Sequence, residues 1–180
     1  MRKIVVAEFI SLDGVVETPE TWHMGYINDE MFRVMWSLND RIDTMLLGRN
    51  TFASFAGAFG SAPAEDAVAA KMNRPAKVVV SSTLTDPGWA NSTVLTGDPV
   101  KGIAALKAQP GGDILTTGST RLVRTMLRAG LVDELSLLVH PIVVGKGERL
   151  FEEDAEPLPL TLLESEAFST GVLHLHYGRA

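Results

Sequence analysis

The sequence predicts an α/β fold of three layers, in which helices cover both faces of a mixed, mostly parallel β-sheet. Short apolar runs rich in Val, Ile and Leu alternate with longer amphipathic segments, a pattern typical of strands joined by crossover helices. The last apolar runs are joined by a short turn instead, which predicts antiparallel strands at the C-terminus. No linker or internal repeat interrupts the pattern, so we expect a single domain over residues 1–180.

Composition agrees with a globular domain and excludes several kinds of chemistry. The chain is 46% hydrophobic and 21% charged, which disfavours disorder. Its net charge of −6 argues against a general nucleic-acid binder, although local basic groups can still receive one anionic cofactor. The absence of cysteine excludes disulfides, cysteine-ligated zinc and a thiol nucleophile.

The N-terminus begins with basic residues and an apolar run, as a signal peptide does. Glu8 interrupts the run, however, and no small-residue cleavage site follows it. A buried first strand is the better interpretation. No segment approaches the ~20 apolar residues of a membrane span. We therefore expect a cytoplasmic protein without membrane contact.

The first half of the chain alternates strand-like and helix-like segments. Asn28 or Asp29 can cap a helix in which Met31, Val34 and Leu38 share one face. The β-branched run at residues 77–80 is a strong strand candidate. We expect strands over residues 4–10, 44–47 and 77–80, and helices running to residue 38 and over residues 50–59 and 64–72.

The second half continues the alternation and ends in strands. Asp98 is placed to begin a helix and Pro110 to end it. Residues 169–171 form the turn between the last strands, and residues 152–159 form a surface loop. We expect strands over residues 92–95, 114–116, 132–139, 158–167 and 172–177, and helices over residues 99–108 and 120–129.

Two turns from strand to helix are candidate phosphate sites. At Gly118 and Ser119, a strand ends and a helix begins, so unpaired N–H groups and the positive end of the helix dipole point outward. At Gly48, Arg49 and Thr51, a guanidinium and a hydroxyl join a similar turn. These features favour a nucleotide cofactor. The alternatives are ordinary turns with a solvated arginine.

Other polar residues follow strands at the same edge of the sheet. Ser81 and Ser82 come after a buried strand, where α/β sheets bind ligands, but serines there also serve as turn or capping residues. Asp13 can be a plain Asp-Gly turn. Trp22 and the neighbouring His23 and Tyr26 can stack on a flat heterocycle or simply cover the core.

Two further patterns carry little weight. His174 and His176 alternate on one strand and so share a face, but no carboxylate at ligand spacing joins them, and we predict no metal site. The segment at residues 145–147 lacks the remaining positions of a phosphate-binding P-loop. The Gly-x-Gly-x-x-Gly dinucleotide fingerprint is also absent, which disfavours a Rossmann oxidoreductase.

Several segments taken in order resemble one family. Ser-Leu-Asp-Gly at residues 11–14, Leu-Gly-Arg-Asn-Thr-Phe at 47–52, Ser-Ser-Thr-Leu at 81–84, Thr-Gly-Ser-x-x-Leu at 117–122, Leu-Val-Asp-Glu-Leu at 131–135 and Gly-x-Gly-x-x-Leu-Phe at 145–151 are similar to motifs of the reductase domain of bacterial riboflavin biosynthesis, which has the dihydrofolate reductase fold. The chain lacks the cysteines and the length for the zinc deaminase domain that often accompanies this reductase. Ser119 departs from the dihydrofolate reductase pattern, which prefers two glycines here.

The resemblance implies a cofactor and a set of residues. The cofactor would be NADPH, with Arg49 facing its phosphates and the loop at Asp13 and Gly14 covering the nicotinamide. Asp13 and Asp29 are the catalytic candidates, although an acid at a helix N-terminus such as Asp29 is also favoured electrostatically. The implied cofactor-binding residues are Gly14, Leu47, Gly48, Arg49, Thr51, Phe52, Ser81, Ser82, Thr83, Thr117, Gly118, Ser119 and Leu122.

The implied activity is hydride transfer to a small substrate, most like that of 5-amino-6-(5-phosphoribosylamino)uracil reductase. A dihydrofolate or pterin reductase is the alternative enzyme, and an acidic residue in a pocket without basic groups would favour it. A non-catalytic nucleotide-binding module on the same fold is the alternative from another class. By resemblance we also expect a homodimer, formed through the C-terminal strands.

Overall fold

The computed structural model describes residues 1–63, 65–153 and 155–180. Its strands are β1 (Ile4–Ser11), β2 (Ile42–Gly48), β3 (Ala76–Val80), β4 (Ser92–Leu95), β5 (Asp113–Thr116), β6 (Glu134–His140), β7 (Leu160–Ala167) and β8 (Leu173–Arg179). Its α-helices are α1 (Asp29–Arg41), α2 (Arg49–Phe59), α3 (Ala67–Asn73), α4 (Pro99–Ala108) and α5 (Thr120–Arg128). Short 3₁₀-helices at Pro19–Thr21 and Met24–Tyr26 were not predicted.

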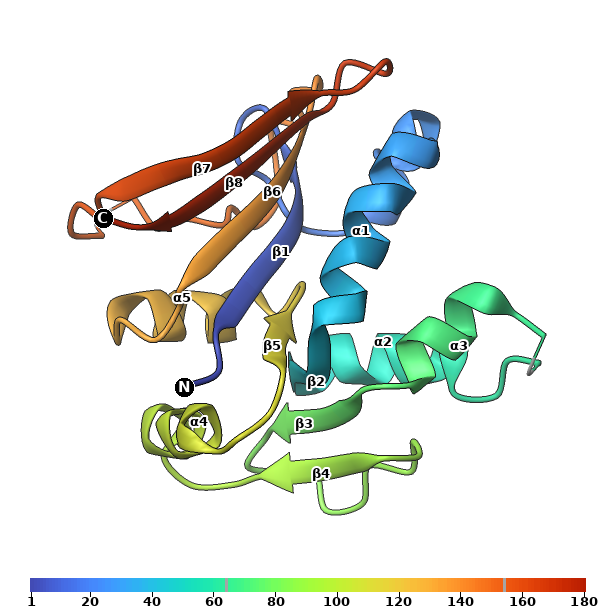
Figure 1. Cartoon of the computed structure of the whole chain (residues 1–180), viewed down its shortest axis with the longest axis vertical. Coiled ribbons are helices and arrows are strands. Elements are labelled where there is room, and N and C mark those ends of the chain that lie inside the picture. Colours follow the sequence, from blue (N-terminus) through green and yellow to red (C-terminus); the bar gives the residue numbers. More distant parts are fainter. Residues whose placement is uncertain (64, 154) are drawn as a thin grey trace.

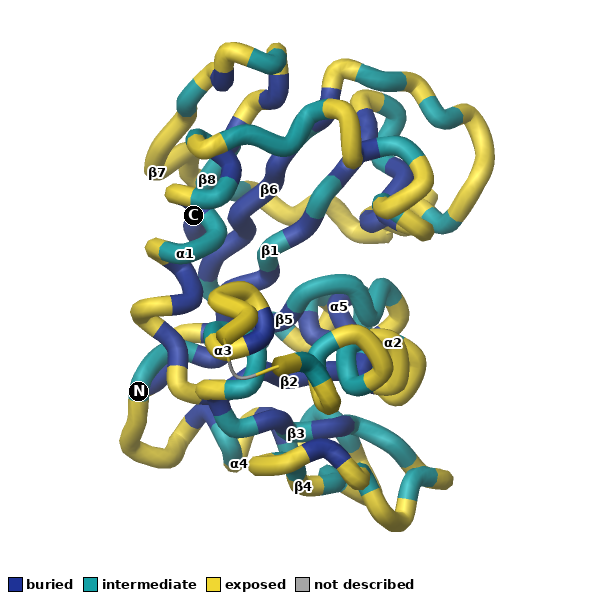
Figure 2. Tube along the Cα trace, turned by 90° about the vertical axis from the view of Figure 1, so that its right-hand side faces the viewer, coloured by how far each residue is buried: buried dark blue, intermediate teal, exposed yellow. Residues whose placement is uncertain are grey.

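The strands form an eight-stranded sheet in the order β4-β3-β2-β5-β1-β6-β8-β7 (Figure 1). The strands from β4 to β6 run parallel, and β8 runs antiparallel to both β6 and β7. The central strand β1 and its neighbour β6 consist mainly of buried residues, whereas β7 is exposed along most of its length (Figure 2). The predicted mixed sheet with antiparallel C-terminal strands is confirmed.

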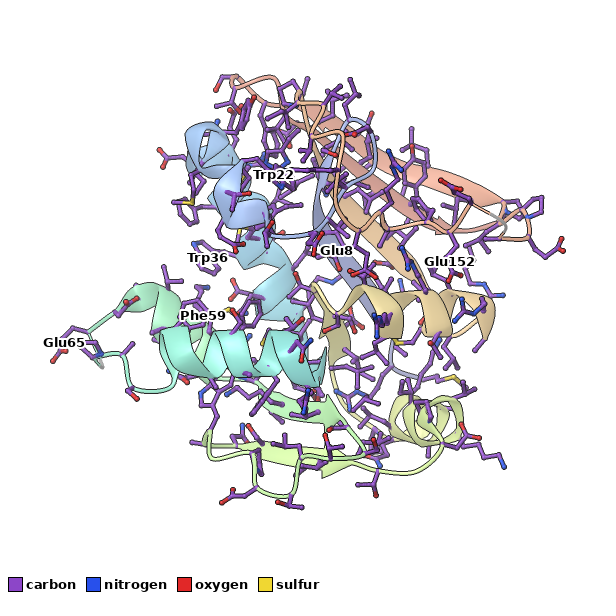
Figure 3. All side chains as sticks on the ribbon, turned by 180° about the vertical axis from the view of Figure 1, so that it is seen from behind. Glu8, Trp22, Trp36, Phe59, Glu65 and Glu152 are labelled. Carbon is purple, nitrogen blue, oxygen red and sulfur yellow. The ribbon has the colours of Figure 1, made fainter. Side chains whose placement is uncertain are left out.

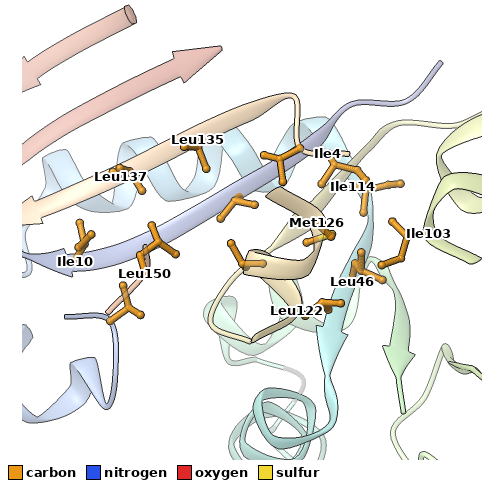
Figure 4. Close-up of a cluster of buried hydrophobic side chains, with 14 residues drawn as sticks. Ile4, Ile10, Leu46, Ile103, Ile114, Leu122, Met126, Leu135, Leu137 and Leu150 are labelled. Carbon is orange, nitrogen blue, oxygen red and sulfur yellow. The ribbon is translucent and has the colours of Figure 1, made fainter. Parts of the chain in front are cut away.

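Helices cover both faces of the sheet, which confirms the predicted three layers. On one face, α1, α2 and α3 pack on a cluster that includes Met31, Leu47 and Phe52. On the other face, α4 and α5 enclose a second cluster around Ile103, Leu122 and neighbouring strand residues (Figure 4). Burial of these apolar side chains is the main source of stability for such a layered fold.

Asx residues begin three of the helices. The side chain of Asn28 accepts from Met31 N–H, and Asp66 and Asp98 accept from the first amides of α3 and α4. The helix starts predicted at Asn28 and Asp98 are therefore confirmed. The helix predicted from residue 64 begins instead at Ala67, after the Asp66 cap, and residue 64 itself lies outside the described residues. The loop predicted over residues 152–159 includes residue 154, which is also outside them.

Some boundaries differ from the prediction because tertiary contacts extend an element. The helix α1 continues past residue 38 to Arg41, since Asn39 is buried and its side chain binds Lys71 and Arg74 of the neighbouring segment. The strand β6 begins at Glu134 and not at residue 132. In the described ranges, no helix combines the length and apolar character needed to cross a bilayer.

Candidate functional site

The predicted cofactor segments meet at one edge of the sheet. Strand β2 pairs in parallel with β3 on one side and with β5 on the other. The carboxyl ends of these strands are therefore neighbours. The turns that follow them carry Gly48–Phe52, Ser81–Thr83 and Thr117–Leu122, which are far apart in sequence. The structure thus brings together the segments in which the sequence indicated a nucleotide.

The turns after β2 and β5 are hydrogen-bonded to each other. Ser119 N–H donates to Thr51 Oγ1 over 2.9 Å, and Gly48 N–H donates to Ser119 Oγ, also over 2.9 Å. A Cβ atom on Gly118 would lie 3.0 Å from Thr51 Oγ1, and the φ of Gly118 is +58°. Glycine is required here by its conformation and by this close approach. The serine at position 119 therefore links the two turns.

The third segment joins this pair through Arg49. The exposed Arg49 guanidinium donates to Thr83 Oγ1 over 3.3 Å. Ser81 Oγ accepts from the backbone N–H groups of Thr83 and Leu84, so it shapes the turn after β3. Ser82 lies exposed between them. Arg49 and the hydroxyl groups near it can reach an anionic ligand from the solvent side.

The helices that start at this edge lack side-chain caps. In the described residues, α1, α3 and α4 are capped by Asn or Asp, whereas the N-cap residues of α2 and α5, Gly48 and Ser119, form no side-chain capping hydrogen bond. The first amides of an uncapped helix carry the positive end of its dipole and need an acceptor. Two such N-termini side by side, with Arg49, form a suitable cradle for a phosphate group.

Three predicted cofactor residues are buried beneath the turns. Leu47 and Phe52 belong to the core on the α2 side, and Phe52 packs against Trp89. Leu122 belongs to the core under α5. Their side chains hold the turns in place from below, and only their backbone can face a ligand.

An apolar pocket of about 220 Å³ adjoins this edge. It lies between β1 and the helices α1, α2 and α3, and Figure 3 shows Trp36 of α1 and Phe59 of α2 on this side of the molecule. Thr117 of the β5–α5 turn also lines the pocket, so the pocket and the phosphate cradle are contiguous. The polar lining residues are Glu8, Asn39, Thr117 and Ser136.

Glu8 is a residue of this region whose sequence context did not mark it as functional. Glu8 (Figure 3) lines the pocket and is 6% exposed. Its Oε2 accepts from Gly118 N–H over 3.0 Å. Its Oε1 is buried and has no partner among the described residues. Burial raises the pKa of Glu8 well above its ordinary value. The neutral carboxyl group is therefore favoured, and it can donate a proton. The only feature of the sequence that pointed to Glu8 was the presence of a carboxylate within an apolar strand.

The predicted catalytic residue Asp13 has a different environment. One carboxylate oxygen accepts from Ser11 Oγ and Val144 N–H, and the other accepts from Gly145 N–H. These hydrogen bonds lower the pKa of Asp13 to about 2. Asp13 does not line the pocket. Its geometry suits anchoring of the loop after β1, which contains Gly14 in a left-handed conformation with φ of +86°.

The second predicted catalytic residue, Asp29, is exposed in the first turn of α1 and does not line the pocket. Its neighbour Glu30 accepts from the backbone and hydroxyl of Ser169, which ties α1 to the turn between β7 and β8. This geometry agrees with the electrostatic preference of helix N-termini for acids. A role of Asp29 in proton transfer stays a prediction.

The aromatic residues near the N-terminus form a cluster around a histidine. The rings of Trp22, His23 and Tyr26 all contact His140, and Phe9 stacks on His23 at 4.4 Å. Burial lowers the pKa of both histidines, so they stay neutral near pH 7. Trp22, His23 and Tyr26 do not line the pocket. Tyr26 packs against the core cluster on the α1 side, and a stacking role of the three rings stays a prediction.

Comparison with known proteins gives one family match. The model of the family described as the RibD C-terminal domain matches residues 2–174. Two proteins of Bacillus subtilis (strain 168) also resemble the chain. The uncharacterized protein YyaP is 29% identical over 180 residues, which cover 98% of this chain and 94% of the relative. The uncharacterized protein YwjB is 25% identical, with 99% of each covered.

Solved structures share the fold over nearly the whole chain. A putative riboflavin biosynthesis protein from Shewanella sp. PV-4 superposes with a TM-score of 0.77 at 23% identity, and 99% of each chain is covered. A pyrimidine reductase-like protein from Corynebacterium diphtheriae has a TM-score of 0.71 at 16% identity, with 99% of this chain and 92% of the other covered. A diaminohydroxyphosphoribosylaminopyrimidine deaminase/5-amino-6-(5-phosphoribosylamino)uracil reductase from Thermotoga maritima has a TM-score of 0.71 at 14% identity, and the match covers 99% of this chain but 57% of that protein.

Proposed function

The chain belongs to the RibD C-terminal domain family, and we propose on this basis that it is an NADPH-dependent reductase of a small heterocyclic substrate. The substrate class would be that of 5-amino-6-(5-phosphoribosylamino)uracil reductase, the activity in the name of the Thermotoga maritima protein. When bound, NADPH supplies the hydride. The protein would align the reacting groups and exclude water, so no nucleophile is needed.

The observation that carries this proposal is the pair of uncapped helix N-termini joined at Ser119. The amides that begin α2 and α5 would bind a phosphate of the dinucleotide, and Arg49 would contact another from the solvent side. Ser82 and Thr83 lie beside Arg49 and would bind sugar or phosphate oxygens. The nicotinamide would then extend past Thr117 into the apolar pocket.

We assign the proton donor to Glu8. Hydride transfer to a carbon leaves the neighbouring nitrogen or oxygen in need of a proton. Glu8 lines the pocket and its buried carboxyl group favours the neutral, proton-bearing form. A neutral Glu8 also avoids repelling an anionic cofactor at the start of α5, where Gly118 N–H donates to it. Asp13 would anchor the loop.

The pocket lining favours one alternative substrate. No Lys or Arg belongs to the described residues that line the pocket, and Glu8 is its only carboxyl group. A flat, uncharged heterocycle such as a dihydropterin fits this lining, whereas a phosphorylated substrate would have to place its phosphate outside it. A dihydropterin is therefore the second candidate. A binding module without turnover stays the alternative from another class.

Parallel titrations with NADPH and NADH, followed by the fluorescence of Trp22, Trp36 and Trp89, test the cofactor. We expect NADPH to bind and Arg49→Ala to weaken its binding at least about tenfold, because one charge-assisted contact is lost. Lys101→Ala is the matched control, since Lys101 is exposed on α4. Oxidation of NADPH is then followed with the phosphoribosylaminopyrimidine and with the dihydropterin. If neither dinucleotide binds at sub-millimolar concentration, the proposed function is wrong.

We also propose that the protein forms a homodimer through β7 and β8. The edge strand β7 exposes Leu162 and Leu163, and the start of β8 exposes Leu173. Their exposed fractions are 52%, 54% and 42%. Leu162 and Leu163 lie near one end of the edge strand β7 and Leu173 lies beside its other end, and exposed apolar residues along an edge strand favour association.

A further inference from the structure

Strands β7 and β8 form an antiparallel pair at the edge of the sheet (Figure 1), and this pair carries a cluster of potential metal ligands. Glu166 lies opposite His174 in this pair, and Glu164 lies two positions along on the same side of β7. Glu164, Glu166 and His174 each offer one ligand atom, and these atoms lie within 4.8 Å of one another. The sequence did not show this cluster, because the carboxylates come from the neighbouring strand.

The imidazole of His174 is positioned as a metal ligand would be. His174 is 5% exposed, and its Nε2 lies 3.0 Å from Ser136 Oγ on β6. With Nε2–H donating to Ser136, the lone pair is on Nδ1, which is buried and has no partner among the described residues. Histidines that bind metals commonly hold their other ring nitrogen through such a hydrogen bond. Burial lowers the pKa of His174, so the neutral form needed for ligation is favoured.

The carboxylates differ in how they are occupied. Glu164 is exposed and forms no hydrogen bond or ion pair with the described residues. Both oxygens of Glu166 accept from Arg33 Nη2 of α1, each over 2.6 Å. The Arg33 side chain is 57% exposed. A positive group thus already neutralises part of the cluster, and it can move into solvent when a cation arrives.

The neighbouring His176 serves as an internal comparison. It lies on the same strand and the same face, but its Nε2 is 3.0 Å from Glu134 Oε2. Glu134 is also bound by Lys3 and Arg41. The carboxylate that His176 binds is therefore already neutralised by two basic residues, although Glu164 lies opposite His176 in the pairing of β7 with β8. Of these two histidines, His174 has a buried ring nitrogen without a partner among the described residues, and the exposed Glu164 beside it is the carboxylate left accessible to an ion.

We propose that Glu164, Glu166 and His174 bind a zinc ion, with Ser136 orienting the histidine. Imidazole nitrogen and carboxylate oxygen are ordinary zinc ligands, with bonds of about 2.0–2.2 Å, and three protein ligands leave a position for water. The three ligand atoms lie within 4.8 Å of one another, and the glutamate side chains can bring them closer to a bound ion by changing rotamer. The proposal does not rest on the reductase function, although Ser136 also lines the pocket.

Isothermal titration of ZnCl₂ into the untagged, chelator-treated chain tests the site, with Co²⁺ absorption as a second readout of tetrahedral coordination. We expect saturable binding of one equivalent. Glu164→Gln and His174→Gln should each weaken the affinity by at least about tenfold. Arg33→Ala should strengthen it, because Arg33 competes for Glu166. Mg²⁺, which prefers oxygen ligands in octahedral geometry, should bind far more weakly.

His176→Gln is the matched control and should leave zinc affinity unchanged. Glu164 is exposed, so its variant should fold, and thermal unfolding of every variant checks this. Absence of saturable zinc binding would overturn the proposal. The proposal is also wrong if His176→Gln weakens binding as much as His174→Gln, or if Glu164→Gln has no effect. None of these measurements requires NADPH or a substrate, so their failure is separate from failure of the reductase function.

Discussion

Thr51 and Ser119 connect the N-termini of α2 and α5, since each offers its side-chain oxygen to a backbone N–H of the other turn or its neighbour. These residues lie 68 positions apart in the sequence. Their contact makes the two helix starts one rigid unit. A ligand that binds one helix N-terminus therefore meets the other in a fixed position.

Thr51→Val should uncouple the two turns. The substitution keeps the shape of the side chain but removes the acceptor for Ser119 N–H, and we expect the free energy of unfolding to fall by about 1 kcal/mol. NADPH affinity should fall as well, because the two helix starts are no longer held in register. Denaturant unfolding and NADPH titration measure these effects. Ser54→Ala, at an exposed position of the same helix, should change neither quantity.

Glu8→Gln should reduce turnover more than binding. The amide preserves the size of the side chain but cannot supply the proton, so kcat should fall at least about tenfold while KM changes little. The pH profile of kcat should also lose the limb that reports deprotonation of Glu8. An unchanged kcat in Glu8→Gln would remove Glu8 from the proton-transfer step.

Glu8→Gln should also change how the stability of the fold depends on pH. The folded-state pKa of Glu8 is raised, so the unfolded chain releases this proton at lower pH than the folded one. Stability contributed by this group is thus complete at acidic pH and is lost as pH rises through the interval up to the folded pKa. Glu8→Gln should be less sensitive to pH in that interval, as measured by thermal unfolding.

Lys77 should make the protein more stable at alkaline pH. Its side chain is buried, with Nζ donating to Asn73 O over 2.7 Å and lying 4.4 Å from the Trp89 ring centroid. Burial lowers the pKa of Lys77 from 10.5 to about 8. Above about pH 8 the folded protein has lost a proton that the unfolded chain keeps. The contribution of Lys77 to stability should therefore rise with pH up to the ordinary lysine pKa.

Lys77→Met separates this contribution from other titrating groups. The variant should show a smaller rise in unfolding temperature between neutral and alkaline pH. Trp89 fluorescence should titrate near pH 8 in the parent protein and not in the variant. If the unfolding temperature rises equally in both proteins, the rise comes from groups other than Lys77.

Leu163→Glu should dissociate the proposed homodimer. A charge beside the exposed Leu162 on β7 would have to be buried in the interface without a partner. Light scattering coupled to size-exclusion chromatography should report a dimer for the parent protein and a monomer for the variant. Met24→Glu, at a residue that is 61% exposed, is the control and should stay dimeric. A monomeric parent protein would refute the proposal directly.

Features that depend on neighbouring residues in the chain could be predicted from sequence. The helix after Asp98 matched its predicted bounds, because its cap and its proline are local signals. The turn at Gly118 was likewise visible as a strand followed by a helix. The motifs of the resembling family identified these turns in their order along the chain. The parallel pairing of β2 with β3 and β5 places the turns side by side in the structure.

Features that depend on contacts across strands could not be predicted. The burial of Glu8 depends on the β5–α5 turn, so the sequence showed only an interrupted apolar run. Asp13 is a catalytic candidate by family resemblance, and its hydrogen bonds to Val144 and Gly145 could not be predicted because these partners are remote in the chain. The carboxylates beside His174 depend on the register between β7 and β8.

The hydrogen bonds of Asp13 have a mechanical consequence. They fasten the loop after β1 to the loop after β6, and Arg149 reinforces the junction by donating to Asp13 O over 3.0 Å. The loop after β1 therefore cannot move independently of the loop after β6. Any opening at this end of the sheet must displace both loops together, so substitutions around Gly145 should alter the motion of a segment more than a hundred residues earlier in the chain.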